Sequence, residues 1–267
     1  MQYVRFESEA QMMQIDVDGD GKPLVLVHSL LTDSTAYDLA GPALATDHQV
    51  IRVSLPGFGS SPPLDLASPT IFDLAEAVAN ALDEAKVGSD AAVLGNGLGA
   101  FVVVALAIRH GDRFDELIVA NGGAAFSPQR QGAFTTMSDL VDESGMEAVV
   151  DIAVKRIFTG DYLASHPDAI NERREVLVKT DPGAFAAACR ALRDMDLRRQ
   201  AADITNRTLV IAGGADETTP PEMARDLAAL IPRAEFVVLD GCGHCPPLEQ
   251  PNEFVKTITN FLKNGSN

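Results

Sequence analysis

Three short segments of this 267-residue chain hold residue types that work together in acyl-transfer chemistry. The glycine-rich turn at residues 95–99 has the Gly-x-Ser-x-Gly spacing of a strand-to-helix turn that presents a nucleophile. Asp216 follows an apolar run and can orient an imidazole, and His244 lies in a second glycine-rich loop and can act as a general base. Either residue alone would be an ordinary turn aspartate or structural histidine, but the order turn, acid, histidine is that of a serine-nucleophile triad.

The central position of this turn is Gly97, which carries no side chain. A serine at this position would attack the acyl carbon, so the chain lacks the nucleophile that the spacing leads one to expect. Two origins stay open: replacement of an original serine by engineering, or a natural relative that works without it. In the second case Asp216 and His244 would act as a dyad that activates water or removes a substrate proton.

A dinucleotide-binding turn is the rival interpretation of the same glycines. Gly95, Gly97 and Ala100 match a relaxed form of that fingerprint. Two features disfavour it: the preceding apolar run at residues 91–94 is not the first strand of its unit, and the next run ends at Asn121 where an acidic ribose partner is expected. We therefore interpret residues 95–99 as a nucleophile turn, and expect no cofactor.

The loop at residues 28–33 follows an early apolar run and is a candidate for binding the reacting oxygen. In triad hydrolases the matching loop supplies one backbone N–H to the oxyanion hole, and the residue after the nucleophile supplies the other. Here these donors would be Leu30 and Leu98. Ser29 in the same loop and Phe126 further along are candidates for substrate contact.

Cys242 and Cys245 flank His244 in a Cys-x-x-Cys pattern, which can be a redox pair or half of a zinc site. Further ligands do not stand nearby in the sequence. Structural or incidental thiols are therefore the favoured interpretation, and no metal is expected.

The segments that must position these residues alternate between short apolar runs and helical patterns. The apolar runs predict buried parallel strands at residues 24–27, 50–53, 91–94, 117–120, 209–212 and 236–239. Helices are predicted between them, including one that begins with Ser68 as its cap and Pro69 at its first position, and others at residues 98–110, 220–231 and 249–263.

This alternation predicts an α/β fold with a mostly parallel, doubly wound sheet. A hairpin of residues 4–9 and 13–17 is expected at the edge of the sheet. Functional groups in such a sheet gather at the carboxyl ends of the strands, which is where the candidate residues stand.

Residues 127–203 interrupt the alternation with helical patterns and no strand signal. We expect a helical cap inserted between two strands and covering the pocket. The core domain would then consist of residues 1–126 and 204–267.

Charge and composition exclude several classes of partner. The chain has 21 basic and 38 acidic residues, a formal net charge of −17, which repels nucleic acid and anionic membranes. The longest apolar run, residues 100–108, is shorter than the roughly 20 residues of a membrane helix. Residues 1–14 lack the pattern of a secretory signal, and three cysteines form no disulfide framework, so a cytoplasmic protein is expected.

Over nearly its whole length the chain resembles the α/β-hydrolase superfamily, and most closely the 3-oxoadipate enol-lactonases. The loop at residues 28–33 is similar to their Asn-Ser-Leu-Gly-Thr-Asp loop, and residues 56–61 resemble their Gly-x-Gly-x-Ser segment. The tail at residues 208–216 and 241–251 is similar as well. The departure is Gly97, where that family has serine.

This resemblance implies an α/β-hydrolase fold and the hydrolysis of a small carboxylic ester or lactone. Asp216 and His244 would fill the acid and base positions of the triad. Two alternatives stay open: an enzyme that uses the dyad without a serine nucleophile, in water-mediated hydrolysis, a lyase reaction or a cofactor-free oxygenation, and a catalytically silent ligand-binding protein. The sequence makes no prediction of the oligomeric state.

Overall fold

A seven-stranded sheet forms the centre of the computed structural model, which describes residues 13–265. The strands lie in the order β1-β3-β2-β4-β5-β6-β7. Their bounds are β1 (Ile15–Asp18), β2 (Lys22–Val27), β3 (His48–Val53), β4 (Ala92–Asn96), β5 (Glu116–Ala120), β6 (Arg207–Gly213) and β7 (Ala234–Leu239). Each of the six predicted parallel strands is present, and the predicted fold class is confirmed.

The edge strand β1 differs in direction from the other strands. It pairs antiparallel with β3, whereas every other neighbouring pair is parallel. The other half of the predicted edge hairpin, residues 4–9, lies outside the described residues. Within the described part of the chain, the antiparallel partner of β1 is therefore β3.

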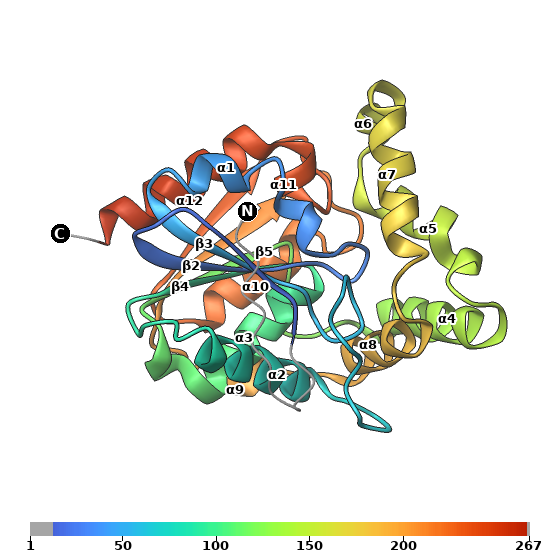
Figure 1. Cartoon of the computed structure of the whole chain (residues 1–267), viewed down its shortest axis with the longest axis horizontal. Helices are drawn as coiled ribbons and strands as arrows, with labels where there is room; N and C mark the ends of the chain where they lie inside the picture. Colours follow the sequence, from blue (N-terminus) through green and yellow to red (C-terminus); the bar gives the residue numbers. More distant parts are fainter. Residues whose placement is uncertain (1–12, 266–267) are drawn as a thin grey trace.

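Helices cover both faces of the sheet (Figure 1). The short ones are η1 (Ser34–Tyr37), α1 (Gly41–Leu44), η2 (Gly111–Arg113), α6 (Gly160–Ser165), α9 (Arg198–Ala201) and α11 (Pro246–Glu249). The longer ones are α2 (Ile71–Glu84), α3 (Leu98–His110), α4 (Pro128–Ser144), α5 (Glu147–Ile157), α7 (Pro167–Leu177), α8 (Pro182–Asp194), α10 (Pro221–Leu230) and α12 (Pro251–Asn264).

Strand residues point alternately to these two layers, as the pleat of a strand requires. In β2, Val25 and Val27 join the apolar cluster with α2, α3 and α10, whereas Leu24 and Leu26 join the cluster with α1 and α12. The five inner strands β2 to β6 are largely buried on both faces, which explains why their sequences hold continuous apolar runs, whereas the edge strands β1 and β7 are only partly buried.

The start of α2 corrects the prediction that Ser68 caps this helix. Thr70 is the N-cap: its hydroxyl accepts the N–H of Asp73, and the Asp73 carboxylate accepts the N–H of Thr70. This reciprocal capping box satisfies two N–H groups that the helix leaves free. Pro69 therefore lies outside the helix rather than at its first position.

The helix α3 is apolar on all sides and buried from Leu98 to Ala107, as its sequence predicts. Its first turn packs directly on β2, because a Cβ atom at Gly99 would lie 2.1 Å from the carbonyl oxygen of Val27. In the sheet, β3 is the neighbour of β2 on one side and β4 is its neighbour on the other side, so the strand order reverses at β2. Loops after β2 and β4 meet at such a reversal, where open α/β sheets bind their ligands.

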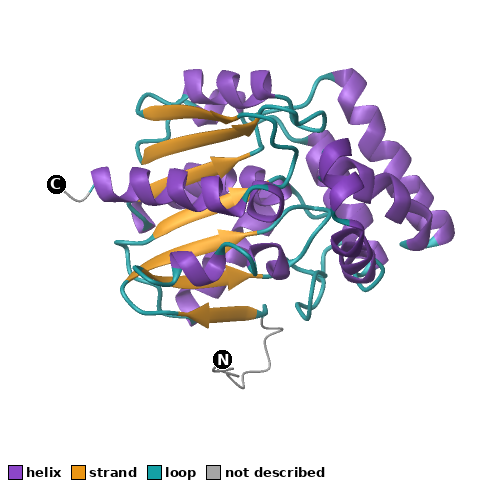
Figure 2. Cartoon of the chain, turned by 90° about the horizontal axis from the view of Figure 1, so that it is seen from above, coloured by secondary structure: helices purple, strands orange, loops and turns teal. Residues whose placement is uncertain are grey.

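Helices α4 to α9 all lie in the chain between β5 and β6. The two ends of this segment meet at an antiparallel bridge between Ala125 and Asp196, beside a hydrogen bond from the N–H of Leu197 to Ala124 O (2.8 Å). Figure 2 shows that most of these helices lie beyond the end of the sheet toward which the parallel strands point. No helix within residues 13–265 combines the length and apolarity needed to cross a bilayer.

Candidate active site

Gly97 forms the sharp turn between β4 and α3, with φ 55° and ψ −117°. This backbone conformation is accessible to glycine and strained for residues with a side chain. A Cβ atom at Gly97 would lie 2.9 Å from His244 Nε2 and 2.1 Å from Ser29 Oγ. The structure therefore brings the turn, the predicted base and Ser29 together at one point.

His244 and Asp216 form a buried pair in which His244 Nδ1 lies 2.9 Å from Asp216 Oδ2. A carboxylate oxygen accepts hydrogen bonds, so Nδ1 of the neutral ring carries the proton. The other ring nitrogen, Nε2, then presents its lone pair toward Gly97 and Ser29 Oγ, which lies 3.4 Å away. This is the geometry of a general base that is oriented by an acid.

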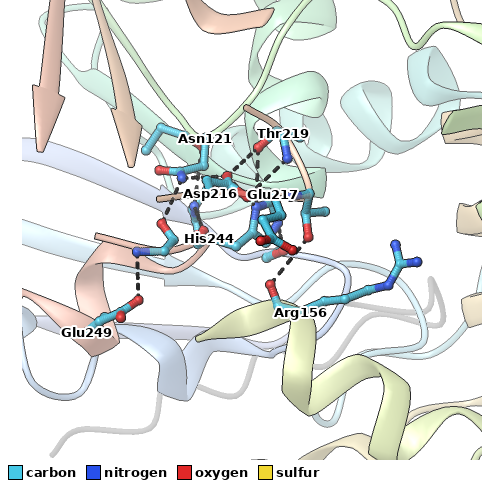
Figure 3. A network of polar contacts seen from close by, with 12 residues as sticks. Asn121, Arg156, Asp216, Glu217, Thr219, His244 and Glu249 are labelled. Atoms are coloured by element: carbon cyan, nitrogen blue, oxygen red, sulfur yellow. Dashed lines mark hydrogen bonds and ion pairs between the residues drawn. The ribbon is translucent and has the colours of Figure 1, made fainter. Parts of the chain in front are cut away.

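Five hydrogen bonds converge on the carboxylate of Asp216. Oδ1 accepts the backbone N–H groups of Thr218 (2.8 Å) and Thr219 (3.0 Å). Besides His244, Oδ2 accepts from the Thr219 hydroxyl (2.6 Å) and from Asn121 Nδ2 (2.7 Å). Figure 3 shows Asn121, Thr219 and His244 around this carboxylate.

These contacts set the charge of the acid. Burial alone would raise the pKa of Asp216, but the electrostatic interaction with His244 and the hydrogen bonds from His244, Thr219 and Asn121 together hold that pKa below its usual value. The carboxylate therefore stays ionised and acts as a fixed acceptor for the Nδ1 proton.

Asn121 and Thr219 are functional candidates that the sequence did not single out. Asn121 follows β5 with φ 52°, and its amide also donates to Gly243 O at 3.0 Å. The sequence signal for Asn121 was its place at the carboxyl end of a strand. The signal for Thr219 was its three-residue spacing from Asp216, which is typical of an aspartate turn. Both signals point to a role in the site only after Asp216 has been identified as the acid that orients His244.

The loop that carries His244 is held from several sides. The N–H of His244 donates to Ile157 O (3.1 Å) at the end of α5, and its carbonyl accepts from Asn96 Nδ2 (3.1 Å). Glu249, labelled in Figure 3, accepts the N–H of Gly243 (2.8 Å). It also accepts the N–H of Thr159 (3.2 Å), so it joins this loop to the helical segment. The position of the imidazole is therefore fixed by the main chain as well as by Asp216.

The two predicted oxyanion donors lie beside this point. Leu30 and Leu98 both line a small inner pocket of about 30 Å³ that also contacts Gly97 and His244. Among the hydrogen bonds of residues 13–265, none is donated by the backbone N–H of Leu30 or Leu98. The N–H groups of Leu30 and Leu98 are therefore free to bind an oxygen atom next to the turn at Gly97.

The inner pocket continues into a larger cavity of about 690 Å³. His244, Phe126, Phe134, Arg156 and Thr218 line both. The predicted contact residues Ser29 and Phe126 therefore lie on the pocket wall, Ser29 in the inner part and Phe126 at the junction.

The charge of the outer cavity contrasts with that of the whole chain. Arg130, Lys155 and Arg156 line it, with Glu217 as the carboxylate among its lining residues. Arg130 donates to the carbonyl oxygens of Glu217 and Thr218. A net positive wall in a chain of net charge −17 favours anionic groups in this cavity.

The glycines of the turn do not form an open phosphate cradle. A Cβ atom at Gly95 would lie 2.1 Å from Gly99 O, and one at Gly99 would meet the backbone of β2. These glycines allow the helix to pack closely against its strand, and the space at Gly97 faces His244 and Ser29. The geometry thus supports the interpretation as a nucleophile turn.

Cys242 and Cys245 are buried free thiols. Burial raises the pKa of Cys242 far above its usual range and that of Cys245 to about 12, so both stay protonated. Within residues 13–265, no three His, Cys, Asp or Glu side chains are placed to hold a metal ion.

Known proteins match this chain over most of its length. A family model described as "Alpha/beta hydrolase family" matches residues 24–257. The 3-oxoadipate enol-lactonase 1 of Acinetobacter baylyi is 26% identical over 251 residues, 94% of this chain and 92% of the relative. A pimeloyl-[acyl-carrier protein] methyl ester esterase of Photobacterium profundum is 27% identical over 92% of this chain and 96% of the relative.

A solved structure of similar sequence has the same fold over nearly the whole chain. The enol-lactonase from Burkholderia xenovorans LB400 superposes with a TM-score of 0.88 and 31% identity, covering 94% of this chain and 96% of that one. The chain therefore spans nearly the full length of the proteins to which it is similar.

Proposed function

The chain belongs to the α/β hydrolase family and is a hydrolase, and we propose that it hydrolyses small carboxylic esters or lactones. The observation that carries the proposal is the buried pair of His244 and Asp216, whose free ring nitrogen faces the turn at Gly97. An imidazole held in this tautomer can take a proton from a hydroxyl group and return it to the leaving group.

In the proposed reaction each group acts on one part of the substrate. His244 Nε2 accepts the proton of the attacking hydroxyl, and Asp216 stabilises the imidazolium that forms. The N–H groups of Leu30 and Leu98 stabilise the negative charge that develops on the carbonyl oxygen. Asn121 and Thr219 hold Asp216 and so keep the imidazole oriented.

We further propose that residues 127–203 form a cap over this site, with residues 1–126 and 204–267 as the core. The proposal is supported by Phe134 and Met137 of α4, which line the inner pocket beside His244. Ile157 and Thr159 contribute the backbone contacts that join the segment to the His244 loop. Such a segment excludes water and limits the size of the acyl group.

The cavity favours a substrate that carries an anionic group in addition to its ester or lactone bond. The basic side chains of Lys155 and Arg156 line the outer part, whereas the inner part beside Gly97 is lined mainly by apolar side chains. The uncharged acyl end would lie inward at His244, and a carboxylate would lie outward against the basic wall. An enol-lactone with a carboxylate side chain fits this distribution.

A panel of p-nitrophenyl esters and enol-lactones tests the proposal. The wild-type chain is expected to hydrolyse at least one class, and His244→Ala to lose at least about 100-fold in kcat/KM. His110→Ala is the matched control, because His110 pairs with Glu76 and is not among the residues that line the two pockets of the site. Tight binding of these compounds without turnover would contradict the proposal in favour of a silent ligand-binding protein.

A further inference from the structure

We propose that Ser29 supplies the nucleophilic hydroxyl that the turn at Gly97 lacks. This inference rests on the proposed function, because it assigns the attacking atom in the same ester or lactone hydrolysis. It makes the chain a serine hydrolase whose nucleophile comes from the loop after β2 instead of the turn after β4.

Ser29 lies directly beside the turn at Gly97. Its Oγ lies 2.1 Å from where a Cβ atom at Gly97 would stand, so the hydroxyl occupies the space of the missing side chain. Ser29 is 1% exposed and lines the inner pocket together with His244. A group entering the pocket at Gly97 therefore meets the hydroxyl of Ser29.

The hydroxyl of Ser29 is hydrogen-bonded to the predicted base. Within residues 13–265, the hydrogen-bond partner of Ser29 Oγ is His244 Nε2, at 3.4 Å. Because Asp216 fixes the proton of His244 on Nδ1, Nε2 can only accept, so Ser29 must donate its proton to the base. A separation of this size is common for catalytic pairs in the absence of substrate and shortens on binding.

The backbone of Ser29 is fixed by neighbours that have no other role in the site. Leu55 N–H donates to His28 Nε2 (2.9 Å), so the proton of this buried ring is on Nδ1 and is donated to Ser29 O (2.8 Å). Thr32 Oγ1 accepts the N–H of Ser29 and donates to its carbonyl, both at 3.2 Å. Burial lowers the pKa of His28, which keeps the ring neutral and this arrangement intact.

The same two N–H groups serve as oxyanion donors in this scheme, but the two residues exchange roles. In the usual arrangement one donor is the residue after the nucleophile and the other comes from the loop after an early strand. With Ser29 as nucleophile, Leu30 is the residue that follows it and Leu98 is the donor from the other loop. Both residues line the inner pocket together with Gly97.

The proposed reaction balances without a cofactor. Ser29 Oγ forms a bond to the acyl carbon, its proton passes to His244 Nε2, and the carbonyl electron pair moves onto oxygen. The acyl C–O bond to the leaving group then breaks, and His244 returns the proton to the departing oxygen. Water next attacks the acyl-Ser29 ester through the same base, which releases the carboxylic acid and restores the hydroxyl.

The test is to map covalent labelling of the full-length wild-type chain by a fluorophosphonate, together with its reaction with p-nitrophenyl acetate. We expect the label on the peptide that carries Ser29, and a burst of nitrophenolate close to one equivalent per chain. Ser29→Ala is expected to lose both and at least about 100-fold of the turnover. Ser34→Ala is the matched control, because Ser34 is a buried serine of the same segment whose hydroxyl donates to Asp16 instead.

The outcomes separate this inference from the proposed function. Hydrolysis without labelling, retained in Ser29→Ala, would overturn the role of Ser29 and assign the reaction to water activated by His244. A silent wild type that gains hydrolysis in the double variant Gly97→Ser/Ser29→Ala would overturn it too, while keeping the site as an ester-hydrolysing one. Absence of both labelling and hydrolysis in all of these chains would overturn both proposals. Labelling of wild type needs no variant to fold, so it decides even where Ser29→Ala is unstable.

Discussion

The hydroxyl of Ser29 and a side chain at residue 97 compete for the same space, because a Cβ atom at Gly97 would lie 2.1 Å from Ser29 Oγ and 2.8 Å from Ser29 Cβ. The chain therefore accommodates one of the two hydroxyl groups next to His244 without a shift.

Restoring a serine at the turn should therefore destabilise the fold. Gly97→Ser introduces a side chain at φ 55°, a strain that costs about 1–3 kcal/mol, and it also displaces the Ser29 hydroxyl. Truncation of Ser29 to alanine should recover part of the loss in the double variant. Denaturant titration of the four chains measures this coupling, and strictly additive effects would contradict the competition.

Replacement of the acid tests whether Asp216 orients the base. Asp216→Asn keeps the shape but turns an acceptor of five hydrogen bonds into an amide that can no longer receive the Nδ1 proton of His244 in the same way. The comparable change in a serine protease triad lowers kcat by about 10⁴, and a loss of this order is expected here. Steady-state kinetics on the variant measure it. An unchanged kcat would exclude a role in orienting the base.

The same carboxylate should leave a signature in the pH dependence of stability. The pKa of Asp216 is lower in the folded chain than in the unfolded chain, so its stabilising contribution is complete above the unfolded value, near 3.9, and is lost as pH falls through the folded value. The stability difference between wild type and Asp216→Asn should therefore shrink below about pH 4. Denaturant titrations of both chains at several acid pH values measure it. A difference that stays constant would contradict the lowered pKa.

The basic wall of the outer cavity should select substrates by charge. Arg156→Gln is expected to raise KM for esters that carry a carboxylate by roughly 2- to 5-fold, since a partly solvated ion pair is worth about 0.5–1 kcal/mol, and to leave neutral esters unaffected. Arg190→Gln is the control, because Arg190 pairs with Asp142 and does not line the cavity. Equal effects of Arg156→Gln on both substrate classes would argue against charge recognition.

Much of this fold was predictable because the inner strands of the sheet are buried on both faces. Continuous apolar runs such as that of β4 and the apolar helix α3 identify a parallel sheet, and the meeting of Gly97, Asp216 and His244 follows from strand ends that share one edge. The start of α2 was misplaced because Ser68 and Thr70 both suit an N-cap. Only the side-chain contact with Asp73 decides between them.

The part of the site that the sequence did not supply depends on side-chain directions. Ser29 was named as a substrate contact, but its position against His244 comes from how the loop after β2 folds, through His28 and Thr32. The donors Asn121 and Thr219 reach Asp216 from two different loops. Spacing in the chain cannot give such angles, since they arise when three strand ends pack side by side.

Chemical rescue of His244→Ala by free imidazole asks whether an imidazole at this one place drives ester hydrolysis. If His244 is the base, the variant loses hydrolysis of p-nitrophenyl acetate and regains part of it with added imidazole in a saturable way, beyond the reaction of imidazole with the ester alone. A His244→Ala variant as active as wild type would contradict the claim that His244 is the base. So would a variant whose activity imidazole raises by no more than it raises the activity of the His110→Ala control.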